Sequence, residues 1–534
     1  MNPKGPGMPR HHPQQSPVVY FLPGEIILHL EHSPSLEADE LERELGSFLN
    51  GKHGALPWTN ELLSPAAGTF NTFRHKRLNK AISLVPARLK DQKAGQETIV
   101  DLLQGIHHQN KGINKDGIVE ISTAGGMLLR LTGASPNWLA GGVPHGIGVP
   151  CPGNWPEVAN ESQANQIKFV LKGENQAVIE IKNNQSQGAG VHVAILDTAP
   201  CLSDIPAAYE KWRIPADDHP HPDDSEPNQL IDNLLCEGGP LHVYPASLEE
   251  QRQAAAYTSM GHPYPMRDHG LFVAGIIHTL APNATLHLYE VMNPYGIGCV
   301  TTITKALSQI LEKSESLGPM LVNCSLALSI SRDGHPAPEY PGEFVDPGLR
   351  VYMDSPYQEI FDRLSDAGIV VVAASGNDAQ DGSRPPARYP AAFKSVIGVG
   401  ALPPENSERP RRKASYSNQA DFPQTDGYAT LGGEAGAGNG VLGIFINPVP
   451  KYDGAMPPEK REVRRDRVKY DNNKSGWVRW AGTSFAAPVI TGILARAWNT
   501  AAPPDLDEAK SILDDLAETE KTDANEKVIL VAQE

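Results

Sequence analysis

The feature that most constrains the fold of this chain is an alternation of short apolar stretches with helix-like stretches, which begins near residue 191. The apolar stretches predict buried strands at residues 191–196, 285–291, 320–325, 369–374 and 395–399. Between them, amphipathic or apolar periodicity predicts helices at residues 271–280, 301–316 and around 356–366. This order predicts an α/β fold with a doubly wound, mainly parallel sheet and helices on both faces.

Polar residues follow several of these strands, and in such a sheet ligands bind beyond the carboxyl ends of the strands. Asp197 ends the first strand, and Asn377 comes shortly after the strand at 369–374. His269, beside Gly270, opens the helix that runs to residue 280. Each of these residues taken singly also suits a plain structural role: a turn, a cap or a buried imidazole.

A hydroxyl-bearing stretch near the C-terminus, Gly482–Pro488, joins this group. Thr483 and Ser484 precede the apolar run at 489–495, where an N-cap or first-turn residue is expected. A serine at that place lies in the positive field of a helix N-terminus, which favours developing negative charge. The alternative is a core helix with an ordinary Ser/Thr start. Together these residues place a carboxylate, an imidazole, an amide and a hydroxyl at one edge of the sheet. A functional site is therefore the better interpretation of the four.

With these residues in place, the chain resembles a subtilisin-like serine peptidase of the subtilase family. The resemblance covers about Gly188 to Trp498, with its motifs in the family's order. They are Val193–Thr198, His269–Gly270 with Val273–Ile277, Ala281–Ala284, Val322–Leu326, Ala373–Asn377, Pro386–Ala391, Ser415–Asn418, Gly482–Ser484 and Ala486–Pro488.

The resemblance implies a catalytic role for each of the four polar residues. Ser484 corresponds to the nucleophile, His269 to the general base and then acid, and Asp197 to the carboxylate that orients the imidazole. Asn377 corresponds to a side-chain donor of the oxyanion hole. No cofactor is required for this chemistry, and a structural calcium ion is expected from the family without an assignable site.

Peptide binding is implied for two backbone segments. Ser325, Leu326 and Ala327 correspond to the strand that pairs with an extended substrate, and Ala374, Ser375 and Gly376 correspond to the facing wall of the primary pocket. The expected partner is a protein or peptide substrate.

The chain departs from the family pattern in two ways. Ala199 and Ala327 replace glycines, and Leu271 and Phe272 stand where Thr-His is usual, which predicts a narrower or reshaped cleft. Insertions are expected at about 202–265 and 425–475, as lids or docking surfaces for a regulatory partner. The acidic, His-containing run at 217–224 is interpreted as a solvated loop rather than a metal site.

The N-terminal half suggests further units. Residues 1–16 are expected to be disordered, 17–150 to form a smaller α+β domain, 151–187 a connector, and 188–534 the peptidase-like domain. Strands are expected at 18–21 and 26–30, with a helix at 36–49 capped by Ser35. The small domain has two interpretations that stay open: a removable prodomain that the enzyme cuts off itself, or a permanent regulatory domain.

Composition excludes several classes of function. A net charge of −17 argues against binding to nucleic acid or to an anionic membrane surface. No apolar run approaches the roughly 20 residues of a membrane span, and the start lacks a secretory signal. The chain has five cysteines, an odd number without paired spacing, which fits free thiols in a reducing compartment. A cytoplasmic location is therefore expected. Secretion is expected only if the N-terminus is incomplete.

Two other functions remain as alternatives to a serine endopeptidase. A catalytically weak, peptide-binding pseudoprotease or regulatory scaffold would not need all four of the polar residues. A hydrolase of esters or other small molecules would more often carry a G-x-S-x-G motif around the serine, and the Ser484 stretch has none.

Overall fold

The computed structural model of the chain describes the main elements of both expected units. The described residues are 21–49, 62, 70–90, 102–103, 105–106, 119–122, 128–141, 155–159, 168–172, 178–179, 187–214, 225–247, 250, 264–318, 320–328, 347–379, 384–404, 411–420, 426–436, 438–453, 465–498, 505–519 and 521–533.

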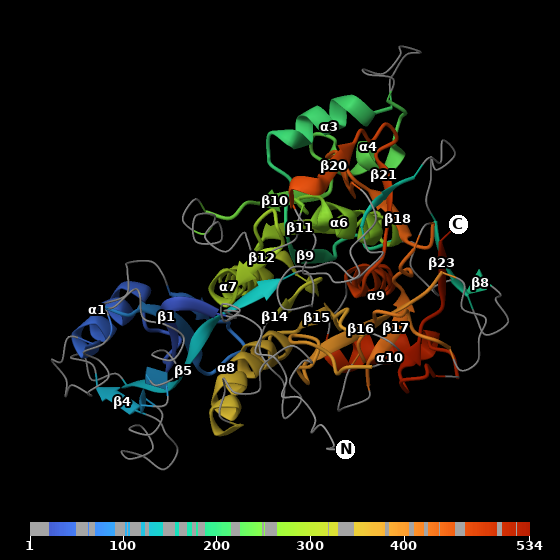
Figure 1. Cartoon of the computed structure of the whole chain (residues 1–534). Helices are drawn as coiled ribbons and strands as arrows, with labels where there is room; N and C mark the ends of the chain where they lie inside the picture. The colour runs from blue at the N-terminus through green and yellow to red at the C-terminus, as the bar shows by residue number, and fades with distance from the viewer. Residues whose placement is uncertain are drawn as a thin grey trace, which may run out of the picture.

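The centre of the molecule is an eight-stranded sheet in which every neighbouring pair runs parallel (Figure 1). Its spatial order is β10 (Leu241–Tyr244), β11 (Thr285–Glu290), β9 (His192–Asp197), β13 (Met320–Cys324), β15 (Ile369–Ala374), β16 (Val396–Leu402), β17 (Tyr428–Leu431) and β22 (Lys527–Val528). The predicted doubly wound, parallel sheet is therefore confirmed.

Helices cover both faces of this sheet, and each face has its own core. Val193 and Ile195 pack on the side of helices α6 and α9, whereas Ala194 and Leu196 pack on the side of α7 and α8. The two sets alternate along β9 because successive side chains of a strand point to opposite faces. The helix bounds are α3 (Asp204–Trp212), α4 (Gln229–Leu235), α6 (His269–Leu280), α7 (Val300–Leu317), α8 (Pro347–Asp366), α9 (Thr483–Ala497) and α10 (Leu506–Leu516).

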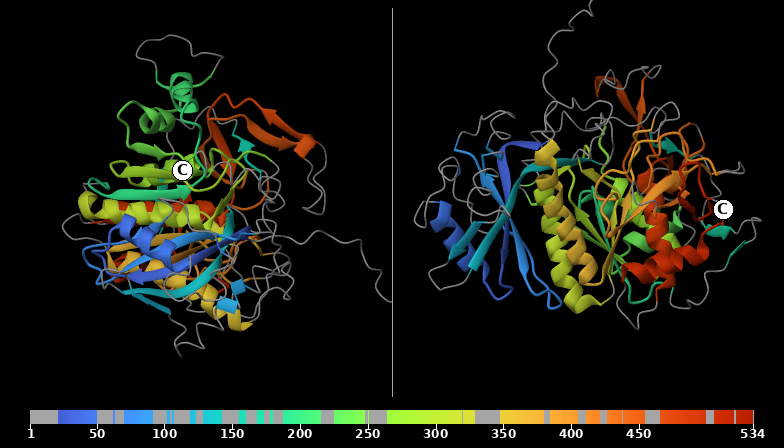
Figure 2. Two further views of the ribbon diagram at one scale, coloured as in Figure 1. Left: turned by 90° about the vertical axis from the view of Figure 1, so that its left-hand side faces the viewer. Right: turned by 90° about the horizontal axis from the view of Figure 1, so that it is seen from below.

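In the described residues, the N-terminal unit is an antiparallel sheet with helix α1 and helical residues at 102–103 and 105–106, and it packs against α7 and α8. Figure 2 shows these two helices side by side between the N-terminal strands and the main sheet. The elements are β1 (Phe21–His32), α1 (Ala38–Leu49), β2 (Asn71–Phe73), β3 (Ala81–Arg88), β4 (Val119–Ser122) and β5 (Leu128–Gly141). One apolar core, shared by the N-terminal strands, α7 and α8, joins the two units.

Buried polar contacts also join the units. The Asn71 side chain donates to the Thr301 carbonyl at 2.9 Å and to Thr304 Oγ1 at 3.0 Å. The Ser135 hydroxyl lies 2.9 Å from His29 Nε2 and 2.7 Å from the Tyr357 hydroxyl. Burial lowers the pKa of His29 to about 3, so the imidazole is uncharged at this interface near neutral pH.

The start of the N-terminal unit differs from the sequence prediction. The strands expected at 18–21 and 26–30 form one strand from Phe21, and residues 18–20 lie outside the described residues. The pairing of β1 with β5 shifts register between Phe21 and Ile26, and Gly24 there has φ of 70°. The Pro23-Gly24 pair thus forms an irregularity within a strand, because glycine adopts a left-handed backbone at little cost.

Three small sheets complete the described structure. They combine β6 (Glu157–Val158) with β21 (Trp477–Trp480) and β18 (Val441–Ile444); β19 (Val449–Tyr452) with β20 (Val468–Asp471); and β7 (Phe169–Lys172) with β8 (Val178–Ile179) and β23 (Val531–Gln533). The 3-10 turn η5 (Arg465–Arg467) precedes β20. The segment 151–187, expected as a connector, therefore contributes strands that pair with the C-terminal part of the chain.

The ranges expected as insertions contain strands of the main sheet. β10 lies within 202–265 and β17 within 425–475, so only parts of these ranges lie outside the central sheet. The sequence of β10, Leu-His-Val-Tyr, is short and half polar because this strand lies at the edge of the sheet. The run 217–224 lies outside the described residues.

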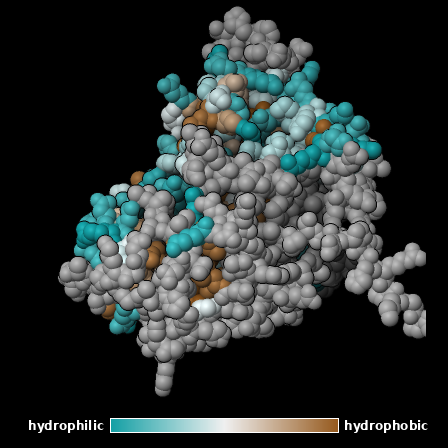
Figure 3. All heavy atoms as spheres, turned by 60° about the vertical axis from the view of Figure 1, so that its left-hand side comes forward, coloured by the Kyte–Doolittle hydropathy of each residue, from teal (hydrophilic) through white to brown (hydrophobic). Residues whose placement is uncertain are grey.

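The described surface is mainly hydrophilic on the face shown in Figure 3. Among the described residues, the exposed large hydrophobic side chains are Leu128, Leu202, Ile214 and Tyr470. None of the described helices combines the length and apolar character that crossing a bilayer would need.

Candidate active site

Asp197 and His269 meet at the carboxyl edge of the main sheet. Asp197 is the last residue of β9, and His269 is the first residue of α6. The Asp197 Oδ1 atom lies 2.7 Å from His269 Nδ1 and also accepts the Thr198 backbone N–H at 2.7 Å. Both side chains are buried, so little water competes for this hydrogen bond. The carboxylate therefore fixes the ring of His269 through Nδ1 and directs Nε2 away from β9.

Gly270 lets helix α6 begin this close to the end of β9. A Cβ atom at residue 270 would lie 2.2 Å from the Thr198 carbonyl oxygen and 2.9 Å from Asp197 Cβ. Any side chain here would push the helix away from the strand. The His-Gly pair in the sequence is thus explained by backbone packing beneath the Asp197–His269 contact.

Ser484 lies at the start of helix α9, as its sequence predicts, and next to the end of β13. It is the second residue of the helix, and Gly482 is the N-cap residue. Its Oγ donates to the Ser325 carbonyl at 3.3 Å, while the Ser325 hydroxyl donates to the Ser484 carbonyl at 2.8 Å. The Asn323 side chain supports this pair by donating to Ser325 Oγ at 2.9 Å. Ser484 is therefore held against the segment that the sequence assigns to substrate pairing.

Asn377 follows β15 and is oriented by the residue before Ser484. Its Oδ1 accepts the Thr483 backbone N–H at 2.8 Å and the Thr483 hydroxyl at 2.7 Å. Because Thr483 engages the oxygen, the amide nitrogen is turned to the other side, where it can donate. The Thr483 hydroxyl also accepts the Gly376 N–H at 3.2 Å, which ties the β15 loop to the start of α9.

Aromatic rings pack around the imidazole. The ring centroids of Trp480 and Phe485 lie 5.2 Å and 5.3 Å from that of His269, and Phe272 lies 4.5 Å from Phe485. Phe485 is 1% exposed, so its ring packs in the interior among these side chains. Phe272, which with Leu271 stands where the family usually has Thr-His, packs in this aromatic cluster.

A further buried carboxylate, Asp268, directly precedes His269. Asp268 Oδ2 accepts the backbone N–H groups of Ile446 at 2.9 Å and Asn447 at 2.7 Å, and Oδ1 accepts the Asn447 side chain at 2.7 Å. Burial is the largest influence on this group and raises the pKa of Asp268 to about 6, against these three hydrogen bonds. Sequence reasoning missed this residue because its partners lie far along the chain.

Strand β5 of the N-terminal unit lies between two short strands, each of which follows a strand of the main sheet. It pairs antiparallel with β12 (Ile297–Cys299) and with β14 (Ala327–Leu328). Gly141 is opposite both Ile297 and Ala327, and Ala140 is opposite both Gly298 and Leu328. Of the three residues expected to pair with a substrate, Ala327 pairs here with the chain's own N-terminal unit, whereas Ser325 and Leu326 lie between β14 and the end of β13.

The other expected wall, Ala374, Ser375 and Gly376, is buried and fixed from behind by Asn418. Gly376 has φ of 110°, and a Cβ there would lie 2.8 Å from Asn418 Nδ2. Asn418 Nδ2 donates to Asp378 Oδ2 at 2.7 Å, and Asp378 forms a two-pronged ion pair with Arg388, with both N–O distances 2.8 Å. The wall is thus a rigid, glycine-containing turn with charged support.

In the part of the chain that the structure describes, no group of three or more His, Cys, Asp or Glu side chains converges to hold a metal ion. The expected structural calcium ion therefore has no assigned residues here and stays a prediction.

Comparison with known proteins decides the family. A sequence profile described as "Subtilase family" matches residues 188–527, which is more than half of the chain. The chain belongs to the subtilase family. The matched range contains all four polar residues of the candidate site, as the motifs in the sequence predict.

Individual relatives of this subtilase are distant. Subtilisin DY from Bacillus licheniformis is 30% identical over 159 residues, which are 28% of this chain and 47% of that protein. The subtilisin-like protease PopC from Myxococcus xanthus is 26% identical over 227 residues, 42% of this chain and 38% of that protein. The chain thus spans less than half the length of either relative. A crystal structure of a lanthipeptide protease covers 62% of this chain and 81% of its own, at 19% identity and a TM-score of 0.38.

Proposed function

We propose that this subtilase is a serine endopeptidase that hydrolyses peptide bonds through an acyl-enzyme on Ser484. The observation that carries the proposal is the 2.7 Å contact of Asp197 with His269 at the same sheet edge as Ser484 and Asn377. A serine hydroxyl is a weak nucleophile until a base removes its proton, and an imidazole held by a carboxylate supplies that base.

In the proposed reaction, Ser484 Oγ bonds to the substrate carbonyl carbon while its proton passes to His269 Nε2. The negative charge that develops on the carbonyl oxygen is stabilised by the Asn377 amide and by the N-terminus of α9. The C–N bond then breaks, and His269 returns the proton to the leaving amine. Water, deprotonated by His269, hydrolyses the ester and restores Ser484.

The substrate is proposed to bind as an extended strand between β12 and β14. Support comes from β5, which shows that an antiparallel strand fits between them and pairs with both. Such binding uses main-chain hydrogen bonds and accepts many sequences, so selectivity depends on the side-chain pockets.

Labelling with a fluorophosphonate probe tests the function, because this reagent bonds to an activated serine. We expect the active form of the wild type to label, and the Ser484→Ala and His269→Ala variants to remain unlabelled. Ser316→Ala, which changes an exposed hydroxyl on α7, serves as the matched control and should label fully. A folded wild type that never labels, with its N-terminal unit either present or released, would overturn the proposal in favour of a peptide-binding scaffold.

We also propose that the N-terminal unit is an inhibitor that the enzyme removes from itself. Its strand β5 lies where the substrate is proposed to bind. Its register runs from Ala140 opposite Leu328 to Gly141 opposite Ala327, in the direction of Ser325, whose carbonyl contacts Ser484. Mass spectrometry of purified protein should find a new N-terminus between residues 142 and 187 that is missing in Ser484→Ala. An active chain that stays intact would instead favour a permanent regulatory domain.

An intracellular location remains a prediction. The four described cysteines, Cys201, Cys236, Cys299 and Cys324, are free thiols, which suits a reducing compartment. Cell fractionation with an antibody to the chain tests it.

A further inference from the structure

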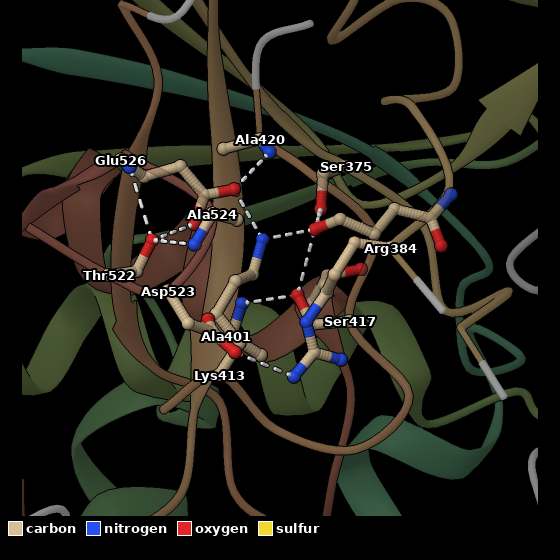
Figure 4. Close-up of polar contacts among 12 residues, drawn as sticks. Ser375, Arg384, Ala401, Lys413, Ser417, Ala420, Thr522, Asp523, Ala524 and Glu526 are labelled. Atoms are coloured by element: carbon tan, nitrogen blue, oxygen red, sulfur yellow. Dashed lines mark hydrogen bonds and ion pairs between the residues drawn. The ribbon is translucent and has the colours of Figure 1, made fainter. Parts of the chain in front are cut away.

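A buried ion pair near the C-terminus lies directly behind the candidate active site. Lys413 and Glu526 are 0% and 3% exposed at their side chains. The ammonium group of Lys413 donates to Glu526 Oε1 and to the Asn418 carbonyl. Figure 4 shows Lys413 between Glu526 on one side and Ser375 and Ser417 on the other. Burial lowers the pKa of Lys413, and the carboxylate of Glu526 opposes that shift.

Asn418 connects this ion pair to the loop that carries Asn377. The Asn418 carbonyl accepts from Ser375 Oγ at 3.3 Å, and its backbone N–H donates to the Gly376 carbonyl at 3.0 Å. Its side chain binds Asp378 twice, accepting the backbone N–H and donating to Oδ2, both at 2.7 Å. Asn418 therefore holds the residues on both sides of Asn377, and Lys413 holds the Asn418 backbone.

Glu526 is brought to this place by the last part of the chain. Its Oε1 also accepts the Ala420 backbone N–H at 2.6 Å, and its Oε2 accepts the Thr522 hydroxyl at 2.8 Å. The next residues form β22, the eighth strand of the main sheet. The C-terminal segment thus supplies the carboxylate that holds Lys413. Lys413 in turn holds Asn418, which contacts the residues on both sides of Asn377.

Stability alone does not explain such a pair. Removing two charges from water costs about as much as their attraction returns, so a buried ion pair adds little net stability compared with an apolar pair of similar size. The pair instead fixes the position of the groups that it contacts, because a charge-assisted hydrogen bond holds its acceptor in a defined place. A side-chain oxyanion donor must be placed within a fraction of an ångström to be useful in the transition state.

We infer that Lys413 and Glu526 are positioning residues for Asn377 and for the wall at 374–376, so that the C-terminal segment is a working part of the active site. Neither residue is placed to touch the substrate, and both act through Asn418. The inference rests on the proposed peptidase function, and its test separates the two.

The test replaces both charges at once, so that no unpaired charge is left buried. In Lys413→Met/Glu526→Leu the apolar pair keeps most of the volume and loses the contact with the Asn418 carbonyl. The matched control is Arg411→Met/Glu518→Leu. These two residues are each 2% exposed at their side chains, and Arg411 holds Glu518 through two hydrogen bonds of 2.9 and 3.0 Å.

The readout is the rate of fluorophosphonate labelling as a function of probe concentration, which separates the maximal rate from the probe concentration at half-maximal rate. For the Lys413/Glu526 double variant we expect the maximal rate to fall about ten- to a hundredfold, with the half-maximal concentration changed less than twofold. The control should keep both within about twofold. A folded Lys413/Glu526 variant with wild-type labelling, or an equal loss in the control, overturns the inference.

Hydrogen exchange keeps the inference testable even if the wild type never labels and the peptidase proposal fails. Backbone amides at 374–379 should then exchange at least about tenfold faster in the Lys413/Glu526 variant than in the control. Equal protection in both would overturn the positioning role. If the double variant does not fold, Glu526→Gln, which keeps an acceptor oxygen, is measured in the same two ways and the same outcomes decide.

Discussion

Asp268 and Asn447 are joined by two hydrogen bonds of 2.7 Å, one from the Asn447 backbone and one from its side chain. Since Asp268 is adjacent to His269, these bonds attach the start of helix α6 to the loop after β18. The loop comes from the range that the sequence suggests is an insertion. A segment that the sequence suggests is an insertion therefore helps to position His269, the proposed general base.

The buried carboxylate of Asp268 should make stability depend on pH. Its pKa in the folded state is raised to about 6 from an ordinary value of 3.8, so between these values the folded chain keeps a proton that the unfolded chain releases. The contribution is fully present below pH 3.8 and is lost as the pH rises through 6, by on the order of 2 to 3 kcal/mol. Urea unfolding of the Ser484→Ala protein, which cannot digest itself, measures this between pH 4 and 7.

The control for that measurement is Asp268→Asn in the same Ser484→Ala background. An amide does not titrate in this range, so the fall in stability between pH 4 and 6 should become smaller. An unchanged pH dependence would assign the effect to other groups.

Replacing Asn377 should impair catalysis without unfolding the chain. Asn377→Ala removes the proposed oxyanion donor, and loss of one such donor in a subtilisin costs on the order of 3 kcal/mol in the transition state. Labelling and turnover should therefore fall by a few hundredfold. Thr483→Val removes the hydroxyl that orients Asn377 but keeps the backbone contact, so a smaller loss is expected. Equal losses in both variants would mean that orientation by the hydroxyl is the whole effect.

Phe485→Ala should loosen the site evenly for all substrates. The ring is buried against His269, Trp480 and Phe272, so its removal leaves a cavity and costs about 3 to 5 kcal/mol of stability. Cleavage of a whole-proteome peptide library should slow with the same preferred residues before the cut. A clean change of preference would place the ring in the substrate pocket.

Tyr357→Phe should weaken the hold of the peptidase-like domain on the N-terminal unit. The Tyr357 hydroxyl lies 2.7 Å from Ser135 Oγ and donates to the Pro136 carbonyl at 3.4 Å, and both partners are on β5. Loss of these contacts costs about 1 kcal/mol, which corresponds to roughly fivefold faster labelling of the uncut chain. Labelling that is no faster than in the wild type would show that release of β5 does not limit access to Ser484.

The sequence predicts five strands of the central sheet and places the four polar residues at strand or helix ends because these signals are local. The runs Val193–Leu196 in β9 and Ile369–Ala374 in β15 are continuously apolar, as is typical of strands buried on both faces, and the motif around Ser484 opens a buried helix. Asp197 and Asn377 then follow from the rule that strand ends share one edge.

What the sequence does not predict depends on distant partners. Lys527–Val528 is too short to be recognised as a strand, yet it extends the sheet and places Glu526 beside Lys413. Trp480 becomes part of the site only when β21 brings it against His269. The insertion of β5 between β12 and β14 involves residues far apart in the chain, and the periodicity of the three strands does not predict it.

The position of β5 has a consequence for when the proposed peptidase could first act. This one strand pairs with β1 in the N-terminal sheet and with β12 and β14 in the other domain, so both partners must be folded before it can lie there. If the first cut is made in the segment that follows β5, a misfolded chain cannot present its own bond to Ser484. Self-cleavage would then depend on correct folding of both units, and only correctly folded molecules would become active proteases.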